Sequence, residues 1–450
     1  MGLRSILFAA LVAVALVGAF YHPIIGLIGY MGHYCIGPER QWWHAPMRGL
    51  GLRYSLMFAL VSAVSIYINR HKLKYKNFMV GQEWLIVIFV LVVWVAHVFS
   101  SASVGRYEAA DHPTVKMVKI TIFLMMLSHV VTDRKLLKIV TWSLVIFAMI
   151  LGIQAYEVPL RAFIQGRLES VGGADFSDAN RFGGFMAAML FIIGCQFLNS
   201  KNWRQRLLVF LAGGFSANAV ILTRSRGALL AVAAGMLAAM MFASPRQRKI
   251  IVVGILGAAL GLYYLTDDTF RERSTTITAQ ADERDASASS RLEIWEGGLK
   301  MMKANPILGV GPGNFYQYIG RYQPLHEGRD AHNTLVRCGG ELGLVGLGVF
   351  LAIVLNAFRL LWTHIRKASQ FSPAVAKDFQ FMGLGYMAAL AAMLAYGMTG
   401  TLVYTEYLWW MLIMPVCLQR AFENEPEAVT TEGPKKSAIE QAIAEKILKV

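Results

Sequence analysis

Apolar runs of about 17–20 residues recur along nearly the whole chain, separated by shorter polar segments. A helix needs roughly 20 residues to cross about 30 Å of hydrocarbon, so runs of this length predict membrane-spanning helices. We expect an all-α, polytopic membrane protein with about twelve or thirteen transmembrane helices, counted from these runs. The predicted spans lie near residues 4–20, 23–37, 52–69, 84–101, 115–131, 137–153, 182–198, 206–222, 226–243, 249–266, 334–362, 380–399 and 402–419.

The composition fits the same class of protein. Of the 450 residues, 56% are hydrophobic, and the mean hydropathy is +0.47. The net charge of +15 would suggest a nucleic-acid partner in a soluble protein, but cytoplasmic loops of membrane proteins are rich in Lys and Arg. We therefore expect membrane lipids around the chain and no nucleic acid. The four cysteines fit neither a disulfide framework nor a zinc site.

The basic residues also predict an orientation. They cluster in loops near 70–76, 134–138, 201–206, 246–249 and 359–367, which alternate with the remaining loops and can all be cytoplasmic. Residues 1–420 then form a single transmembrane domain, and residues 421–450 form a cytoplasmic tail. The two long extracytoplasmic loops are 154–181 and 267–331, and the second is the largest polar segment.

The first apolar run leaves one alternative open. It resembles a signal peptide, but no convincing cleavage site follows, so we interpret it as a retained anchor. The basic loops place residues 38–51 outside. Either residue 1 also starts outside, or the first run does not fully span the membrane.

Arginines occur in all three extracytoplasmic segments, against the usual charge rule. The tight turn at 223–227 holds Arg224 and Arg226, and the two long loops hold Arg181 and Arg291 among others. An anionic ligand would account for them, because the guanidinium fork binds phosphate through two parallel hydrogen bonds. The alternative is that loop arginines are solvated or contact lipid headgroups. Arg224 and Arg226 sit close to the hydrocarbon, where ionisable groups are usually functional.

Polar side chains continue into the Gly-rich run that starts near residue 333. Asn333, Arg337 and Glu341 follow at intervals of four, so they share one helical face. A charge inside the membrane costs several kcal/mol unless it is paired or hydrated. These residues therefore line a polar cavity or, alternatively, form a buried ion pair with only a structural role.

His332 precedes this helix and is the candidate catalytic base. The positive end of a helix dipole disfavours a protonated imidazole, and nearby arginines act in the same direction. A neutral imidazole can accept a proton near neutral pH. Asp330 and Glu327 are both close enough in sequence to orient it. The alternative is a histidine that caps the helix or contacts headgroups.

Searches for other chemistry give no match. The sequence has no D-x-D pair, Walker loop, H-E-x-x-H or G-x-S-x-G motif, and nothing in it requires a metal. The G-V-G-P-G segment at 309–313 predicts a turn that could present backbone N–H groups to an anion.

Four segments together resemble the O-antigen ligase family. They are SRGALLA at 225–231, SRLEIWEGGLK at 290–300 continuing to NPILGVGPGNF at 305–315, HNTLVRCGGELGLVGL at 332–347 and, more weakly, DANRF at 178–182. The resemblance implies a bacterial inner-membrane glycosyltransferase that takes a glycan from undecaprenyl diphosphate on the periplasmic side, without metal, nucleotide sugar or other cofactor. The implied acceptor is the lipid A–core of lipopolysaccharide. Glycan polymerisation and protein glycosylation use the same donor and stay open.

The resemblance also implies roles for individual residues. His332 would deprotonate the acceptor hydroxyl, and direct displacement would invert the anomeric centre. Arg226 and Arg291 would hold the diphosphate, with Arg224, Arg181 and Arg337 as secondary candidates. Asn333, Asp330 and Glu341 would support them, and Trp295 would stack on a sugar or anchor the chain at the interface. The non-enzymatic alternative is a transporter or flippase of an anionic lipid, for which the expected mark is an inverted repeat with broken helices.

Overall fold

The chain folds into a bundle of helices. The computed structural model describes residues 2–74, 76–100, 111–245, 247–249, 251–254, 257 and 286–426. The helices in these ranges are α1 (Leu3–Tyr21), α2 (Pro23–Ile36), α3 (Tyr54–Ile68), α4 (Gly81–Val98), α5 (Pro113–Val130), α6 (Arg134–Glu157), α7 (Ala179–Asn199), α8 (Trp203–Thr223), α9 (Arg226–Phe242), α12 (Ala286–Ala304), α13 (Phe315–Tyr322), α14 (Thr334–Lys367), α15 (Pro373–Gly397) and α16 (Glu406–Glu423), with short 3-10 turns such as Trp42–Leu50.

The prediction of an all-α, polytopic membrane protein is confirmed. Among the described residues, eight helices are long and apolar enough to cross a membrane, and a bent pair formed by Trp42–Leu50 and α3 would make nine. Every predicted span coincides with a helix except the one at 249–266, which lies mostly outside the described residues. The helices α2, α3 and α9 coincide with predicted spans but have only 14, 15 and 17 residues.

The most buried helices form the centre of the bundle. In α15, 78% of the apolar window is buried, against 17% in α1 at the periphery. The last helix of the described residues, α16, is buried along almost its whole length, including Trp409 and Trp410. Peripheral helices instead leave large apolar side chains exposed, as a lipid-facing surface requires.

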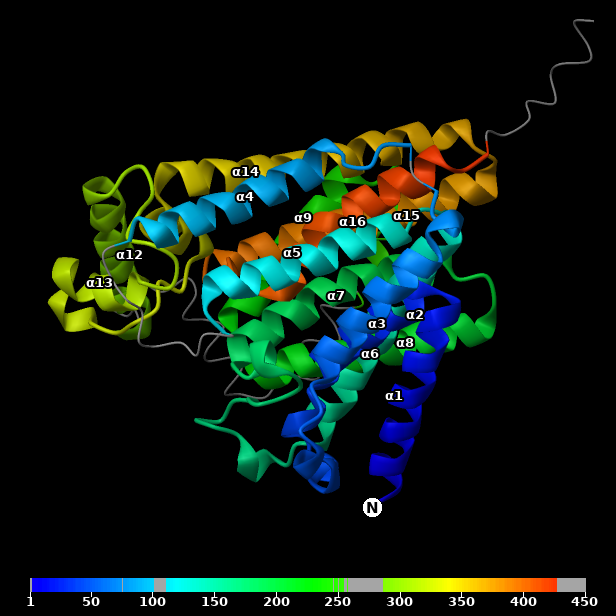
Figure 1. The fold of residues 1–450 in the computed structure, drawn as a ribbon, viewed down its shortest axis with the longest axis horizontal. Coiled ribbons are helices and arrows are strands. Elements are labelled where there is room, and N and C mark those ends of the chain that lie inside the picture. Colours follow the sequence, from blue (N-terminus) through cyan, green and yellow to red (C-terminus); the bar gives the residue numbers. More distant parts are fainter. Residues whose placement is uncertain are drawn as a thin grey trace, which may run out of the picture.

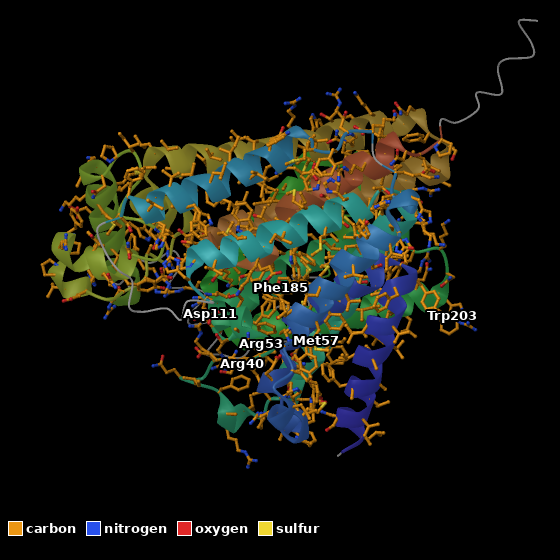
Figure 2. The ribbon with its side chains drawn as sticks, viewed as in Figure 1. Arg40, Arg53, Met57, Asp111, Phe185 and Trp203 are labelled. Carbon is orange, nitrogen blue, oxygen red and sulfur yellow. The ribbon has the colours of Figure 1, made fainter. Side chains whose placement is uncertain are left out.

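Figure 1 shows α12 and α13 gathered beside the start of α14, with the last turns of α14 and the start of α15 at the opposite end. We call the end that carries α12, α13 and His332 the histidine end. The opposite end holds the basic loops, where Arg134 pairs with Asp378. In Figure 2, Arg40 and Arg53 lie toward the histidine end, whereas Trp203, at the start of α8, lies away from it.

The start of α1 lies at the histidine end. Arg4 forms an ion pair with Glu157, the last residue of α6, and Ser5 donates a hydrogen bond to the carbonyl of Trp43. The helix α1 is long enough to span, so it runs from the histidine end to the other. Of the two arrangements left open for the N-terminus, the structure has the one in which the start of α1 and residues 38–51 share a side.

The predicted span at 334–362 is not one continuous helix. At about 1.5 Å per residue, the 34 residues of α14 would extend about 51 Å, well beyond about 30 Å of hydrocarbon. Its backbone breaks at Gly343, where φ is 65° and ψ is −164°. The turns before the break pack against α12, because Gly298 lies against Val336 and Gly339 against Met302. The part that holds Arg337 and Glu341 is thus enclosed by protein rather than by lipid.

The segment 306–311 fills the break in α14. The N–H groups of Val310 and Gly311 donate to the carbonyls of Gly340 and Glu341 at 3.0 and 2.9 Å, and the N–H of Leu344 donates to the carbonyl of residue 306 at 2.7 Å. Polar backbone groups exposed by a broken helix must find partners at membrane depth, and this segment supplies them. The expectation that G-V-G-P-G presents N–H groups to an anion is wrong for Val310 and Gly311, which the helix already uses.

Candidate functional site

The candidate site lies where several helix ends meet. Gly184 of α7 and Gly227 of α9 both pack against Tyr396 near the end of α15, and Gly227 also faces Thr399. Asn333, the N-cap of α14, donates to the carbonyl of Met398 at 3.2 Å. The N-termini of α7, α9 and α14 are therefore assembled around the end of α15. Each N-terminus carries a partial positive charge, so the arrangement favours an anion.

His332 occupies a strained position at the centre of this arrangement. Its φ is 45°, a left-handed conformation that non-glycine residues rarely adopt. The residues on both sides of His332 are held. The indole N–H of Trp295 in α12 donates to the Ala331 carbonyl at 2.9 Å, and the Asn333 side chain accepts from the N–H groups of Leu335 and Val336 at 2.9 and 3.1 Å. Strain of this kind persists where the surroundings impose it.

Burial favours the neutral form of His332. Burial lowers the pKa of His332 below its ordinary value of 6.5; the carboxylates of Asp330 and Asp178 oppose this effect, and the guanidinium groups of Arg291 and Arg181 reinforce it. Asp330 has the larger influence of the two carboxylates. The other carboxylate considered from the sequence, Glu327, lies instead against Gly320 of α13.

Asp330 is ionised although it is buried. Burial by itself would raise the pKa of Asp330, but the charge of Arg337 lowers it below the ordinary value. Its Oδ1 atom also accepts the N–H of Ala331 at 2.9 Å. The same carboxylate therefore fixes the backbone beside His332 and acts on its charge.

Arg181 and Arg291 are arginines whose charges act on His332. Arg181 lies in the first turn of α7 and Arg291 in α12, and both are partly buried. Within the part of the chain that the structure describes, the guanidinium of Arg181 makes no hydrogen bond or close ion pair. A buried, positively charged group of this kind is suited to an anionic ligand.

Arg226 and Arg224 lie beside the site in different settings. Arg226 is the first residue of α9, partly buried, next to the Gly227 that packs on Thr399. Arg224 ends α8 in a left-handed conformation, and its Nη1 donates to the Gly166 carbonyl at 2.7 Å. Arg224 thus ties the loop after α6 to the turn between α8 and α9.

Arg337 is enclosed in an ion network. Its Nε lies 3.0 Å from Oε1 of Glu341, and its Nη1 lies 3.2 Å from Oδ1 of Asp330. Tyr404 donates to the second oxygen of Glu341 at 2.8 Å, and the guanidinium lies over the rings of Tyr316 and Tyr404. Two carboxylates already balance the charge of Arg337, so this geometry favours the structural alternative for the Arg337–Glu341 pair.

Two residues of the site were not singled out from the sequence. Asp178 caps α7 by accepting from the N–H groups of Asn180 and Arg181 at 2.9 and 3.0 Å, and its charge also acts on His332. Tyr396 is buried beside Asp178, Arg181, Asp330 and Arg291. An aspartate directly before a helix could have indicated the first. A tyrosine at the end of an apolar run is typical of the membrane interface, so nothing in the sequence indicated Tyr396 as a site residue.

No metal cluster is evident in the described ranges, where no group of three or more His, Cys, Asp or Glu side chains could hold an ion.

The fold and the site together define a polytopic, all-α membrane protein with a cationic, histidine-containing site at one end of its bundle. Residues 211–351 match the family model described as O-Antigen ligase, which confirms the resemblance drawn from the sequence. The match runs from the second half of α8 to the middle of α14 and includes α9, α12 and α13. It indicates a membrane protein with a glycosyltransferase-like function.

Other comparisons add less. No curated protein is significantly similar in sequence. One similar solved structure comes from work entitled "Structural coordination of polymerization and crosslinking by a peptidoglycan synthase complex". The two chains are 15% identical, the TM-score is 0.43, and the similarity covers 77% of this chain and 99% of that one. A likeness at this level supports no argument about function.

Proposed function

We propose that the protein is an inverting, metal-independent glycosyltransferase. It transfers a glycan from undecaprenyl diphosphate to an acceptor hydroxyl at the periplasmic face of the bacterial inner membrane. The observation that supports this most strongly is the meeting of His332, Arg181 and Arg291, which come from three separate parts of the chain. The match of residues 211–351 to the O-antigen ligase family supports the same reaction class.

Each group has a defined task in this reaction. The acceptor oxygen attacks the anomeric carbon of the sugar while the bond from that carbon to the diphosphate oxygen breaks. The hydroxyl proton passes to the imidazole of His332, and the bond electrons leave with the lipid diphosphate. Arg181 and Arg291 stabilise the charge that grows on the leaving group, with Arg226 at the adjoining start of α9. Such preorganised electrostatic stabilisation is usually the largest contribution to catalysis.

The proposed acceptor is the lipid A–core, with a growing glycan or a protein hydroxyl as alternatives that share the donor. The transporter alternative is less well supported. The broken helix α14 would suit a transporter if it lined a substrate cavity. Its break is instead filled by the backbone of 306–311.

The test is glycan transfer by the purified protein in lipid vesicles. A radiolabelled undecaprenyl-diphosphate glycan is supplied with lipid A–core, with a second carrier-linked glycan or with a hydroxylated peptide. We expect transfer to one acceptor, and a fall in kcat of about 10²–10⁴ for His332→Ala, the usual worth of a general base. Arg181→Ala and Arg291→Ala should lower kcat and raise KM together.

Matched controls separate the site from general effects. Arg161→Ala removes an exposed arginine of the loop after α6, and His71→Ala removes an exposed histidine outside the site. Both should transfer at the wild-type rate. Wild-type transfer by His332→Ala and Arg181→Ala would remove the mechanism. Lipid movement across the vesicle without any transfer would support the transporter alternative.

A further inference from the structure

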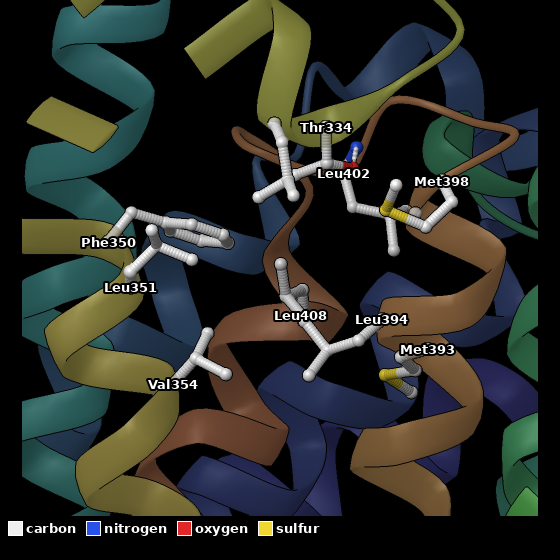
Figure 3. Close-up of a pocket in the computed structure, with 11 residues that line it drawn as sticks. Thr334, Phe350, Leu351, Val354, Met393, Leu394, Met398, Leu402 and Leu408 are labelled. Atoms are coloured by element: carbon white, nitrogen blue, oxygen red, sulfur yellow. Dashed lines mark hydrogen bonds between the residues drawn. The ribbon is translucent and has the colours of Figure 1, made fainter. Parts of the chain in front are cut away.

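An apolar groove opens directly beside the candidate site. It encloses about 150 Å³ between α14, α15 and α16. Figure 3 shows Phe350, Leu351 and Val354 of α14 facing Leu394 of α15 and Leu408 of α16 across this space. The lining is almost entirely hydrocarbon, and the groove plays no part in the reaction steps above.

The groove begins at Thr334, which is two residues after His332 in the sequence. Thr334 lines its upper end, and the Thr334 hydroxyl is already engaged, since it donates to the Gly400 carbonyl and accepts the N–H of Leu402, both at 3.0 Å. Met398, which also lines this end, has its carbonyl bound by the Asn333 side chain. The wall of the groove is thus continuous with the backbone that positions His332 and offers no free polar group.

The groove is open toward the outside of the bundle. Leu351 and Met398 line it and are 39% and 43% exposed. The neighbouring exposed side chains of α14 are also large and apolar, with Leu355 at 69%. A ligand could therefore enter sideways from the hydrocarbon while its polar end stays at the surface.

Size and charge define the ligand. A dry cavity of about 150 Å³ lined by aliphatic side chains holds a molecule as large as benzene, which is close to one five-carbon isoprenoid unit. The cationic residues Arg181 and Arg291 act on His332 just above the groove, so the ligand has an anionic head. A branched isoprenoid unit also fills such a width better than a single row of methylene groups, because unfilled space loses packing contacts.

We propose that this groove binds the isoprenoid unit next to the diphosphate of the lipid donor, and that most of the remaining carrier chain lies in the bilayer. The assignment rests on the proposed function, because it takes the donor to be a prenyl diphosphate. It predicts that a glycan on a short prenyl diphosphate is used almost as well as one on the full-length carrier. A glycan on a straight saturated alkyl diphosphate should be used less well.

A matched pair of substitutions on α14 tests the groove. Leu351→Trp fills its opening, whereas Leu355→Trp makes the same change one turn further along, on the exposed face. Lipid tails are as apolar as leucine, so an isoprenoid unit that is excluded from the groove moves into lipid and not into water. Blocking the groove therefore loses packing contacts and exposes no apolar surface to water. We expect Leu351→Trp to raise KM for the prenyl donor about tenfold with little change in kcat. A tenfold effect is at the low end of the range for a pocket that loses a small apolar contact. Leu355→Trp should leave both constants unchanged.

A binding measurement keeps this test independent of transfer. The probe is a farnesyl diphosphate analogue with a diazirine in its first isoprenoid unit, photolysed with the wild-type protein in vesicles. Labelling within 350–354 or 393–408 that unlabelled farnesyl diphosphate displaces, and that Leu351→Trp reduces, supports the proposal. Should Leu351→Trp fold poorly, Leu394→Phe fills the same groove from α15.

The outcomes separate the groove from the reaction. Labelling that is equal in Leu351→Trp and Leu355→Trp, or is displaced by phospholipid as readily as by farnesyl diphosphate, overturns the proposal. Groove labelling in a protein that transfers no glycan would remove the proposed function and would still support a prenyl diphosphate site.

Discussion

Trp295 offers the sharpest test of how the site is held together. Its indole N–H donates to the carbonyl of Ala331 at 2.9 Å, directly before His332. His332 is held at a φ of 45°, so its backbone would relax if this support were lost. We expect Trp295 to act as a positioning residue, in contrast to the stacking on sugar considered from the sequence.

The two roles predict different responses to the same pair of substitutions. Phenylalanine keeps an aromatic face but cannot donate the hydrogen bond, and alanine provides neither. If Trp295 positions His332, Trp295→Phe and Trp295→Ala should both lower kcat. If Trp295 stacks on sugar, Trp295→Phe should be nearly wild type, and Trp295→Ala should mainly raise KM.

The size of the effect follows from the lost bond. A neutral hydrogen bond contributes about 0.5–1.5 kcal/mol, and the left-handed backbone stores about 1–3 kcal/mol that favours relaxation once the bond is gone. A loss of about 0.7–1.4 kcal/mol in the transition state lowers kcat about 3- to 10-fold. Donor KM should stay within a factor of about two, because the arginines are untouched.

Steady-state transfer kinetics with the labelled donor measure both constants. Trp84→Phe is the control, since Trp84 is a 54% exposed tryptophan of α4. It should change neither constant. Wild-type kcat in Trp295→Phe would refute the positioning role, as would a rise in KM confined to Trp295→Ala.

Three further predictions concern the same structure. The acid limb of kcat/KM should lie below pH 6.5, because burial lowers the pKa of the base. Arg291→Gln should move this limb to higher pH and Asp330→Asn should move it to lower pH, measured as pH profiles of transfer. Gly343→Ala should lower the free energy of unfolding by about 1–3 kcal/mol in thermal denaturation, because its new Cβ would lie 2.3 Å from the carbonyl oxygen of residue 307 at a positive φ, whereas Gly348→Ala meets nothing within 4 Å and should be neutral or stabilising. Transfer should persist in excess EDTA, and a loss restored by one divalent metal would contradict metal independence.

Much of the fold could be predicted from the length of the apolar runs alone. The bilayer requires helices of a minimum length, so an apolar run reports a span without knowledge of its neighbours. The break at Gly343 could not be predicted in this way. Five glycines stand at 339, 340, 343, 346 and 348, and the sequence distinguishes none of them. The broken position depends on backbone groups supplied by residues 306–311, and such a contact leaves no local pattern.

The candidate site shows the same limit for side chains. The spacing of Arg337 and Glu341 predicts their ion pair, because residues four apart on a helix are neighbours. The pairing of Arg337 with Asp330 needs the chain before α14 to turn back, which the left-handed His332 allows. The sequence therefore identifies the charged residues, but it does not show which of them bind a ligand and which form structural ion pairs. Which arginines are free to bind a ligand depends on which of them pair with carboxylates in the folded chain. Arg337 forms ion pairs with two carboxylates, whereas the guanidinium of Arg181 makes no close ion pair with any residue that the structure describes. We therefore expect a diphosphate to bind Arg181, for which packing provides no direct ion pair among the described residues.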